Sequence, residues 1–369
     1  MLDLTGLPYI DGHMHPPLRH PPVTPRAYRW PWYEGSAESS HMVTDLATYR
    51  VALRELAEHL GCEESEDAVL AAIGRRDPGS WFAEMMELGG IQGLIMDMGY
   101  PDPTDALSLE QARTMSGVEV RPLLRIESVA GGLIEHARSF TELAERYDAT
   151  LRAARDDGYL GLKSIIAYRT GLAVEAVDET AASEAYEQQR SIGSRISAKP
   201  LIDHLLVRAL RIARELELPV QLHTGYGDRD LDLMRGNPLH LRPLLESGAA
   251  DGVPLVLLHG SWPYSREAAY LAAVHEHVYM DVATCIPPLG FGEMTSMWRI
   301  ALAAAPLTRI QASTDAAGLP EQVGLGARWS RRSLAAALEE LVRADMLRAG
   351  EAEEAAAGIL AGNARRLYV

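Results

Sequence analysis

The sequence is poor in cysteine and has no long apolar run, and each absence excludes a class of protein. Its two cysteines, Cys62 and Cys285, provide no disulfide framework, which favours a reducing, cytoplasmic compartment. Nowhere do about 18 apolar residues follow one another, so we expect no membrane-spanning helix. The segment Met1–Tyr9 lacks the basic and apolar regions of a secretory signal.

Positive charge is also scarce. Lys and Arg together number 35 against 51 Asp and Glu, which gives a formal net charge of -16. Nucleic acids and anionic membrane surfaces attract basic proteins, so we expect neither as a partner. We expect a small-molecule substrate instead, while the number of subunits stays open, with a homo-oligomer as one alternative.

The composition is that of one globular domain spanning residues 1–369, with 47% hydrophobic and 23% charged residues. Short apolar runs alternate with longer helix-like stretches, which is typical of βα units around a parallel sheet. Eight such runs predict an α/β fold of the (β/α)8 TIM-like barrel type. The expected strands are Tyr9–His13, Gly93–Asp97, Glu119–Ile126, Gly161–Ile166, Val220–His223, Leu255–His259, Val278–Val282 and Arg309–Ser313.

Helical patterns fill the gaps between these runs. Leu201–Glu217 carries an apolar stripe, as a helix covering a barrel does. Leu334–Ala349 and Ala352–Ala361 have the same pattern. The Asn237-Pro238 pair predicts the start of a further helix that runs through Leu245.

The stretch 16–80 after the first strand is too long for a simple βα loop. It begins rich in proline and aromatic residues, around Trp30 and Trp32, and turns helical from about Thr44 to Ile73. We expect a helical insertion after strand one that forms a lid over the barrel mouth. An outer helical layer or an oligomer contact is the alternative.

Metal ligation is first suggested by His13 and His15 at the end of strand one. Side chains two apart in a strand point the same way, so both imidazoles can face the barrel interior. The pair alone is a weak signal, because 12 histidines in 369 residues give about 0.4 such pairs by chance. A second pair, His275 and His277, precedes its strand and therefore belongs to the opposite face, where we expect a structural or solvated role.

Further polar groups end other apolar strands on the expected catalytic face. His223 ends strand five, His259 ends strand six, and Asp315 directly follows strand eight. Lys163 lies within the apolar strand four, where a lysine must be paired, neutral or modified. Imidazoles and a carboxylate are suitable ligands for first-row divalent metals, so we expect a metal site here.

These motifs resemble those of the amidohydrolase superfamily, and in particular of FluG-type, or nodulin-like, amidohydrolases. The order His-x-His, Lys, His, His, Asp on strands one, four, five, six and eight carries the resemblance. So does the local sequence of Lys163–Leu172, His223–Asp228 with Asn237–Leu239, Leu257–Pro263, Ser313–Asp315 and Gly362–Tyr368. The likeness covers nearly the whole chain and is least clear from about His20 to Ser80. In such families the domain can be fused to a glutamine-synthetase-like domain; nothing follows Val369, so we expect a free-standing hydrolase.

The resemblance implies a metal-dependent enzyme and allows two metal schemes. In the binuclear form, one metal is bound by His13, His15 and Asp315, and the other by His223 and His259. A CO2-carboxylated Lys163 bridges the two, and a hydroxide activated by the metals attacks the substrate while Asp315 transfers a proton. In the mononuclear form, His13, His15, His223 and Asp315 bind one metal, Lys163 stays an amine, and His259 stabilises the oxyanion. We expect Zn2+, with Mn2+ as the alternative.

Candidate substrate-binding residues lie at or just past the ends of strands three and four. They are Arg125, Glu127, Tyr168 and Arg169. An arginine can bind a substrate carboxylate with two parallel hydrogen bonds, and Glu127 can meet an amine. The alternative is that Arg125 pairs with Glu127, or that Arg169 points to solvent.

Hydrolysis of a C–N bond, for example in a γ-glutamyl amide, is the function that the resemblance favours. It comes from analogy and not from spacing. The main alternative is metal-dependent, non-oxidative decarboxylation of an aromatic acid, which related barrels perform with one metal and no carboxylated lysine. A third reading is a metal-binding protein without enzymatic activity.

Overall fold

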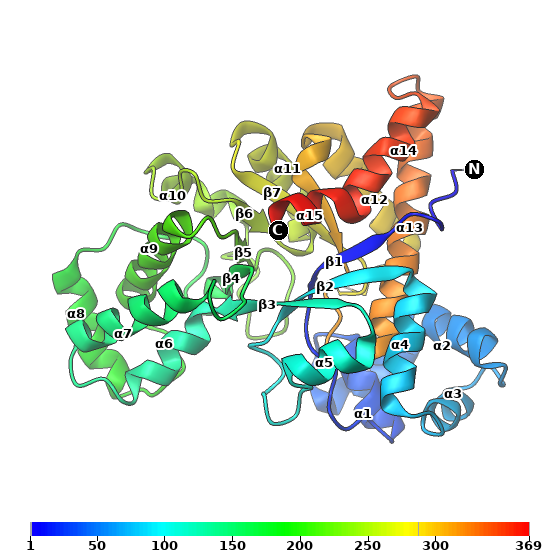
Figure 1. Ribbon diagram of the computed structural model, residues 1–369, viewed down its shortest axis with the longest axis horizontal. Helices are drawn as coiled ribbons and strands as arrows, with labels where there is room; N and C mark the ends of the chain where they lie inside the picture. The colour runs from blue at the N-terminus through cyan, green and yellow to red at the C-terminus, as the bar shows by residue number, and fades with distance from the viewer. Residues whose placement is uncertain (1, 287, 369) are drawn as a thin grey trace.

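The computed structural model describes residues 2–286 and 288–368, and its centre is one parallel sheet of eight strands (Figure 1). The strands follow one another in chain order around the sheet, as expected for a (β/α)8 barrel. All eight expected strands are confirmed, with ends that agree to within two residues. They are β1 (Tyr9–Met14), β2 (Ile91–Asp97), β3 (Glu119–Arg125), β4 (Gly161–Ser164), β5 (Val220–Leu222), β6 (Leu255–Leu257), β7 (Val278–Ala283) and β8 (Ile310–Ser313).

The first and last strands meet at their carboxyl ends. The backbone N–H of Asp315 donates to the carbonyl of His13 at 3.0 Å, and the N–H of His15 donates to the carbonyl of Ala316 at 2.8 Å. These bonds join the ends of β1 and β8, where three of the expected metal ligands lie. The closure of the barrel therefore positions the candidate site directly.

Helices surround the sheet (Figure 1). Outside the insertion they are α5 (Leu109–Ser116), α6 (Ile126–Ile134), α7 (Phe140–Ala153), α8 (Glu179–Arg190), α9 (Lys199–Glu215), α10 (Arg242–Glu246), α11 (Ser265–Val274), α12 (Phe291–Ala304), α13 (Pro320–Arg343), α14 (Ala349–Ala357) and α15 (Asn363–Leu367). The expected helix over residues 201–217 is confirmed as α9. The start at Asn237 is confirmed too, because its side chain accepts from the N–H of Leu239 at 3.0 Å.

The expected helix Leu334–Ala349 is wrong in both bounds, since α13 begins at Pro320 and ends at Arg343. Its first half is buried on nearly every side, so the sequence there lacks the polar face that marks a surface helix. The helix ends before Asp345, whose φ of 57° is left-handed and does not continue an α-helix. The expected helix Ala352–Ala361 corresponds to α14, and a π-helical turn, Gly358–Gly362, continues it as far as α15.

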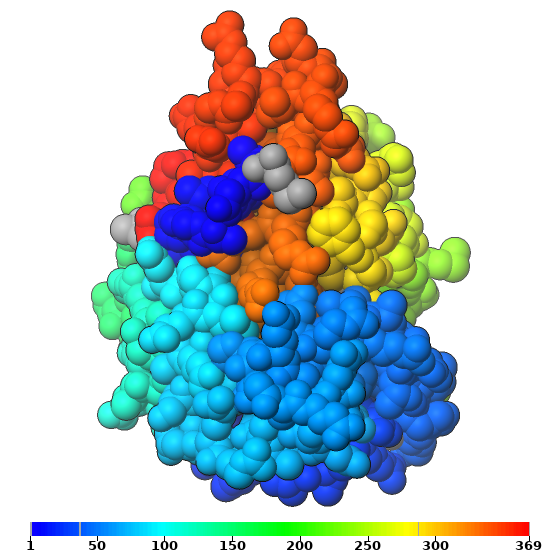
Figure 2. Space-filling model, turned by 90° about the vertical axis from the view of Figure 1, so that its right-hand side faces the viewer, coloured from blue at the N-terminus to red at the C-terminus, as the bar shows by residue number. Residues whose placement is uncertain are grey.

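The stretch after β1 is helical, as expected. It contains α1 (Pro25–Arg29), the 3-10 segments Trp30–Trp32 and Ala37–Asp45, α2 (Ala47–Leu60), α3 (Glu66–Ile73) and, at its end, α4 (Pro78–Gly89). Gly61, at φ 63°, ends α2 and separates it from α3. Figure 2 shows these blue segments together on one side of the molecule, next to the orange α13. Gln322 of α13 donates to the carbonyl of Pro31 at 2.6 Å, which ties the insertion to the barrel.

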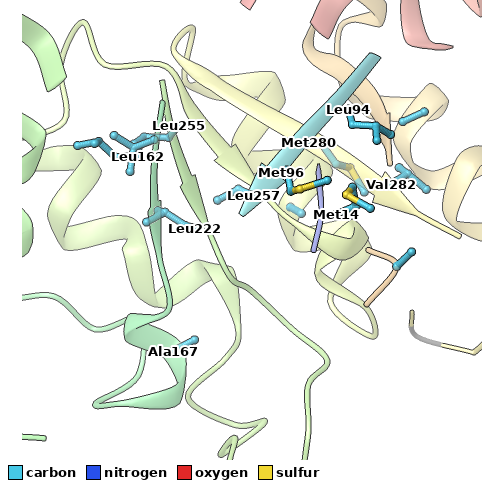
Figure 3. Packing of buried hydrophobic residues seen from close by; sticks show 14 of the residues in the cluster. Met14, Leu94, Met96, Leu162, Ala167, Leu222, Leu255, Leu257, Met280 and Val282 are labelled. Atoms are coloured by element: carbon cyan, nitrogen blue, oxygen red, sulfur yellow. The ribbon is translucent and has the colours of Figure 1, made fainter. Parts of the chain in front are cut away.

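Strand alternation separates an apolar layer from a polar barrel interior. Leu162, Leu222 and Leu257 belong to the main buried apolar cluster, part of which is drawn in Figure 3. Their neighbours along the strands, Lys163 and Gln221, are equally buried but polar. Since successive side chains of a strand point to opposite faces, these polar groups face the barrel interior.

The C-terminal segment contributes to the barrel interior. Tyr368 is buried with Ile95 and Leu123, and its hydroxyl accepts a hydrogen bond from Gln221 Nε2 at 2.6 Å. The same Gln221 nitrogen donates to the carbonyl of Gly12 at 2.8 Å. Within the described residues, no helix combines the length and apolar character needed to cross a membrane.

Candidate metal centre and substrate cavity

Two histidines and an aspartate converge where β1 and β8 end. His13 Nε2 lies 3.4 Å from Asp315 Oδ1, and His15 Nε2 lies 3.6 Å from the same oxygen. One ligand atom from each of the three residues lies within 4.8 Å of the other two. The two imidazoles thus face one side, as the i, i+2 spacing predicts.

Asp315 and His259 both have left-handed backbone conformations, with φ of 53° and 62°. For residues other than glycine this conformation costs about 1 kcal/mol or more, so the surroundings must impose it. At Asp315 the N–H donates to the carbonyl of His13, and at His259 the N–H donates to Asp281 Oδ1 at 3.3 Å. Such strain is typical of functional sites, and here it directs both side chains to the same place.

The other expected ligands join this group from the middle strands. His223 Nδ1 and His259 Nε2 face each other at 2.9 Å, and His259 Nδ1 lies 3.1 Å from Asp315 Oδ2. Lys163 Nζ lies 3.4 Å from His13 Nε2. The structure therefore brings together all six residues expected from the sequence, and their role as ligands stays a prediction.

Burial sets the charge state of this cluster. It lowers the pKa of His13 to about 4, with the Lys163 charge adding to the effect, and it lowers the pKa of Lys163 to about 8. Burial also holds the pKa values of His223 and His259 well below the usual histidine range. Neutral imidazole is the form that binds metals.

Asp315 behaves in the opposite way. Burial alone would raise its pKa, but the neighbouring imidazoles, His259 first and then His13 and His15, hold the pKa well below its usual value. An ionised carboxylate beside neutral imidazoles is the donor set of divalent first-row metal sites. The residues present therefore fit one metal at His13, His15 and Asp315, with His223 and His259 able to hold a second.

Asp97, at the end of β2, is a residue of this site that the sequence reasoning missed. It is fully buried and forms an ion pair with Arg125, whose Nη2 lies 2.6 Å from Asp97 Oδ2. Asp97 Oδ2 also lies 3.9 Å from His15 Nδ1, on the side of the ring away from Asp315. Burial would raise the pKa of Asp97, but Arg125, His15 and Lys163 together lower it below the usual value.

A cavity of about 400 Å3 opens above the cluster and reaches His15, Lys163, His223 and Asp315. Three of the four expected substrate-binding residues, Arg125, Tyr168 and Arg169, line it. The ring of Tyr168 lies 4.5 Å from that of His223, centroid to centroid, and its hydroxyl accepts from the N–H of Asp228 at 3.2 Å.

Glu127 is placed differently. Its Oε1 accepts a hydrogen bond from Ser164 Oγ at 2.6 Å, the side chain is buried, and Glu127 is absent from the described residues that line the cavity. Burial raises the pKa of Glu127. Arg125 pairs with Asp97 and not with Glu127, so the pairing considered from the sequence is not found in the described part of the chain.

The insertion reaches the cavity through the 3-10 segment Trp30–Trp32 that follows α1 and the loop after it. Trp30, Pro31, Tyr33 and Glu34 from this stretch line the cavity wall together with barrel residues. Glu34 was not expected from the sequence, because no motif or strand end marks it. The second histidine pair lies elsewhere: His275 and His277 directly precede β7, at the N-terminal end of the strand, as expected.

Known proteins with similar sequences are consistent with a metal site of this kind. The amidohydrolase family model matches residues 10–369. Protein fluG of Emericella nidulans is 28% identical over 98% of this chain, which spans only 45% of the length of that relative.

Among solved structures, one of a Lactobacillus casei protein described as a metal-dependent hydrolase has a TM-score of 0.89 and 28% identity, covering 98% of this chain and 95% of that one. A uronate isomerase of Thermotoga maritima, 14% identical with a TM-score of 0.70 and covering 99% of this chain and 95% of its own, shares the fold. The resemblance inferred from the motifs is thereby confirmed, and the chain belongs to the amidohydrolase family of enzymes.

Proposed function

We propose that this enzyme hydrolyses the C–N bond of a small amide, and that γ-glutamyl amides are the class to test first. The observation that carries the proposal is the convergence of His13, His15 and Asp315 at the floor of a cavity, with Lys163 beside His13 and the His223–His259 pair beside Asp315. This arrangement provides metal ligands, a proton acceptor and a binding space in one place.

The bound metal, which we propose to be Zn2+ or Mn2+, would polarise the amide carbonyl and lower the pKa of a water molecule. The side chains supply the remaining chemistry. Asp315 accepts one proton from the attacking water and passes it to the leaving nitrogen, so that the C–N bond breaks into a carboxylate and an amine. The neighbouring imidazoles hold the pKa of Asp315 below its usual value, so the side chain is ionised and has no proton of its own before the reaction.

Lys163 is the residue that favours hydrolysis over decarboxylation. It is fully buried, and burial lowers its pKa to about 8, which raises the fraction of neutral amine. A neutral amine adds CO2 to give a carbamate and a proton, and the carbamate oxygens could bridge the two ligand groups. A decarboxylase of related fold needs no such bridge, whereas the binuclear hydrolase scheme does.

The charged cavity residues support an acyl group that carries a carboxylate. Arg125 is paired with Asp97 and is therefore partly neutralised. Arg169 lines the same cavity, and within the described chain its Nε has no hydrogen-bond partner. An arginine without a carboxylate partner is suited to bind a substrate carboxylate. We also propose that the insertion acts as a lid, because its loop at Trp30–Glu34 forms part of the cavity wall.

The proposal is tested by incubating the metal-loaded enzyme with γ-glutamyl amides, N-acyl amino acids and hydroxybenzoates. Release of free amine from the first class, which depends on Asp315, is the expected result. Release of CO2 from a hydroxybenzoate, without hydrolysis of any amide, would replace this proposal with the decarboxylase reading. An Asp315→Asn variant serves as the control for background hydrolysis, because it keeps the shape but cannot accept the proton.

A further inference from the structure

Strand β6 ends in a turn of left-handed backbone. His259, Gly260 and Ser261 have φ of 62°, 60° and 49°, so three successive residues share this conformation. Glycine adopts it freely, but in His259 and Ser261 the Cβ atom crowds the following carbonyl oxygen. Contacts from other parts of the fold must therefore hold the turn in place.

The turn changes the direction in which the His259 side chain points. Leu255 and Leu257 of β6 belong to the apolar layer outside the barrel interior (Figure 3). Side chains two apart in an extended strand point the same way, so His259 would follow Leu257 into this layer if β6 simply continued. Its ring lies in the candidate site instead, with Nε2 2.9 Å from His223 Nδ1 and Nδ1 3.1 Å from Asp315 Oδ2. The left-handed turn thus brings the imidazole into the site.

Asp281 of β7 holds the first residue of this turn. Its Oδ1 accepts hydrogen bonds from the N–H of His259 at 3.3 Å and from Ser313 Oγ at 2.6 Å, and its Oδ2 accepts one from Gln311 Nε2 at 3.1 Å. The carboxylate is fully buried, and in the described part of the chain no lysine or arginine pairs with it. Burying a carboxylate costs free energy that these hydrogen bonds must offset, so accepting them is what the side chain contributes here.

The far end of the turn is held by the residues that follow β5. Thr224 Oγ1 donates to the carbonyl of Leu258 at 3.0 Å and lies 2.6 Å from Ser261 Oγ. Gly225 packs so closely that a Cβ atom at this position would lie 2.3 Å from the carbonyl carbon and oxygen of Ser261. These contacts fix the residues on either side of His259, whereas Asp281 holds the N–H of His259 itself.

We propose that Asp281 is a positioning residue of the reaction, whose carboxylate holds the N–H of His259 and so keeps the turn that directs the His259 ring toward Asp315 and His223. Asp281 is absent from the described residues that line the cavity, so it acts through His259. The position of the ring matters in both metal schemes, because the ring either binds the second metal or stabilises the oxyanion. The kinetic consequence rests on the proposed amide hydrolysis, whereas the placement of the ring does not.

The alternative is that Asp281 only joins β7 to β8 through Ser313 and Gln311. Three substitutions separate the two roles. Asp281→Ala removes every acceptor, Asp281→Asn keeps an oxygen for the N–H of His259, and Ser313→Ala removes one bond to β8 while it leaves the bond to His259. Asn363→Ala is the matched control, because this buried side chain also donates two hydrogen bonds, to backbone carbonyls at the other end of β8.

Kinetics of the metal-loaded enzyme with a γ-glutamyl amide give the first test. Asp281→Ala should lose about 100-fold in kcat with KM changed by less than about threefold, because a small displacement of a catalytic group has an effect of this size. Asp281→Asn should keep at least about a tenth of the wild-type kcat. Ser313→Ala and Asn363→Ala should stay within about twofold of the wild type, even where they lower the melting temperature. An equal loss of kcat in Ser313→Ala and Asp281→Ala would favour the strand-joining role and overturn the inference.

Crystal structures of the metal-free variants separate this inference from the proposed function. In Asp281→Ala we expect His259 to leave the left-handed conformation and its Nδ1 to lose contact with Asp315, while Asp281→Asn keeps both. A ring that stays in place in Asp281→Ala overturns the inference, whether or not amides are hydrolysed. If no amide is hydrolysed, the proposed function fails, and the structures alone decide the role of Asp281. Asp281→Leu, which fills the space and offers no acceptor, takes the place of the alanine variant if that variant does not fold.

Discussion

The guanidinium of Arg125 holds the buried carboxylate of Asp97 through two nitrogens, with 2.6 Å from Nη2 and 3.1 Å from Nε to Oδ2. The same carboxylate lies 3.9 Å from His15 Nδ1. Asp97 thus connects an arginine of the cavity wall to a candidate metal ligand. The backbone carbonyl of Asp97 accepts a hydrogen bond from His15 Nδ1 at 3.4 Å, so Asp97 orients the ring through its backbone and places a negative charge beside it.

Asp97→Asn should therefore lower both the metal affinity and the stability of the folded protein. The amide keeps the shape of the side chain but leaves the charge of Arg125 uncompensated. We expect metal affinity to fall by about 10- to 100-fold and the free energy of unfolding of the metal-free protein by about 3 kcal/mol. Chelator competition and urea unfolding measure the two effects. Asp45→Asn, which removes the exposed ion pair with Arg50, is the control and should change neither. Wild-type metal affinity in Asp97→Asn would show that the Asp97 carboxylate pairs with Arg125 but does not affect metal binding.

Metal content tests the ligand assignment. The double substitution His13→Ala with His15→Ala removes two of the three convergent donors, so we expect elemental analysis to find little tightly bound metal. The chain offers a matched control in His275→Ala with His277→Ala, the same spacing at the opposite end of a strand. That variant should retain the wild-type metal content. Full metal retention in the first double variant would refute the site.

Lys163 is expected to act chemically and not only structurally. Lys163→Ala should lose at least about 100-fold in kcat yet stay folded, and short carboxylic acids such as propionate should restore part of the activity by replacing the carbamate. The chain has one other lysine, Lys199, which allows a clean spectroscopic test. With 13C-labelled CO2, a carbamate signal should appear in the wild type and in Lys199→Ala and be absent from Lys163→Ala. Normal turnover in Lys163→Ala would end the bridging hypothesis.

The barrel and the convergence of the candidate ligands could be predicted because both depend on local pattern. Each of the eight strands is a short apolar run, and a histidine or aspartate directly after such a run must lie on the catalytic face. His223, His259 and Asp315 follow this rule. Asp97 follows it as well, since it closes the apolar strand β2, and the same signal could have identified it.

Other parts of the site depend on packing that the sequence pattern does not encode. Glu34 lies in a loop of the insertion, and only the docking of that loop against α13 brings it to the cavity. Glu127 lies in the first turn of α6, where its partner Ser164 from the neighbouring strand draws it away from the cavity wall. The start of α13 was missed for a related reason, because burial on nearly every side removes the amphipathic pattern.

The role of Arg169 can be separated from a merely structural one by kinetics. Arg169→Met keeps much of the apolar stem and removes the charge, so binding of a substrate carboxylate should weaken. For γ-glutamyl amides we expect kcat/KM to fall by about tenfold or more, mainly through KM. For an amide of the same amine whose acyl group carries no carboxylate, the decrease should be much smaller. Arg146→Met, an exposed arginine that pairs with Glu142, is the matched control and should affect neither substrate. An equal loss for both substrates in Arg169→Met would mean that Arg169 supports the barrel wall and does not recognise a carboxylate.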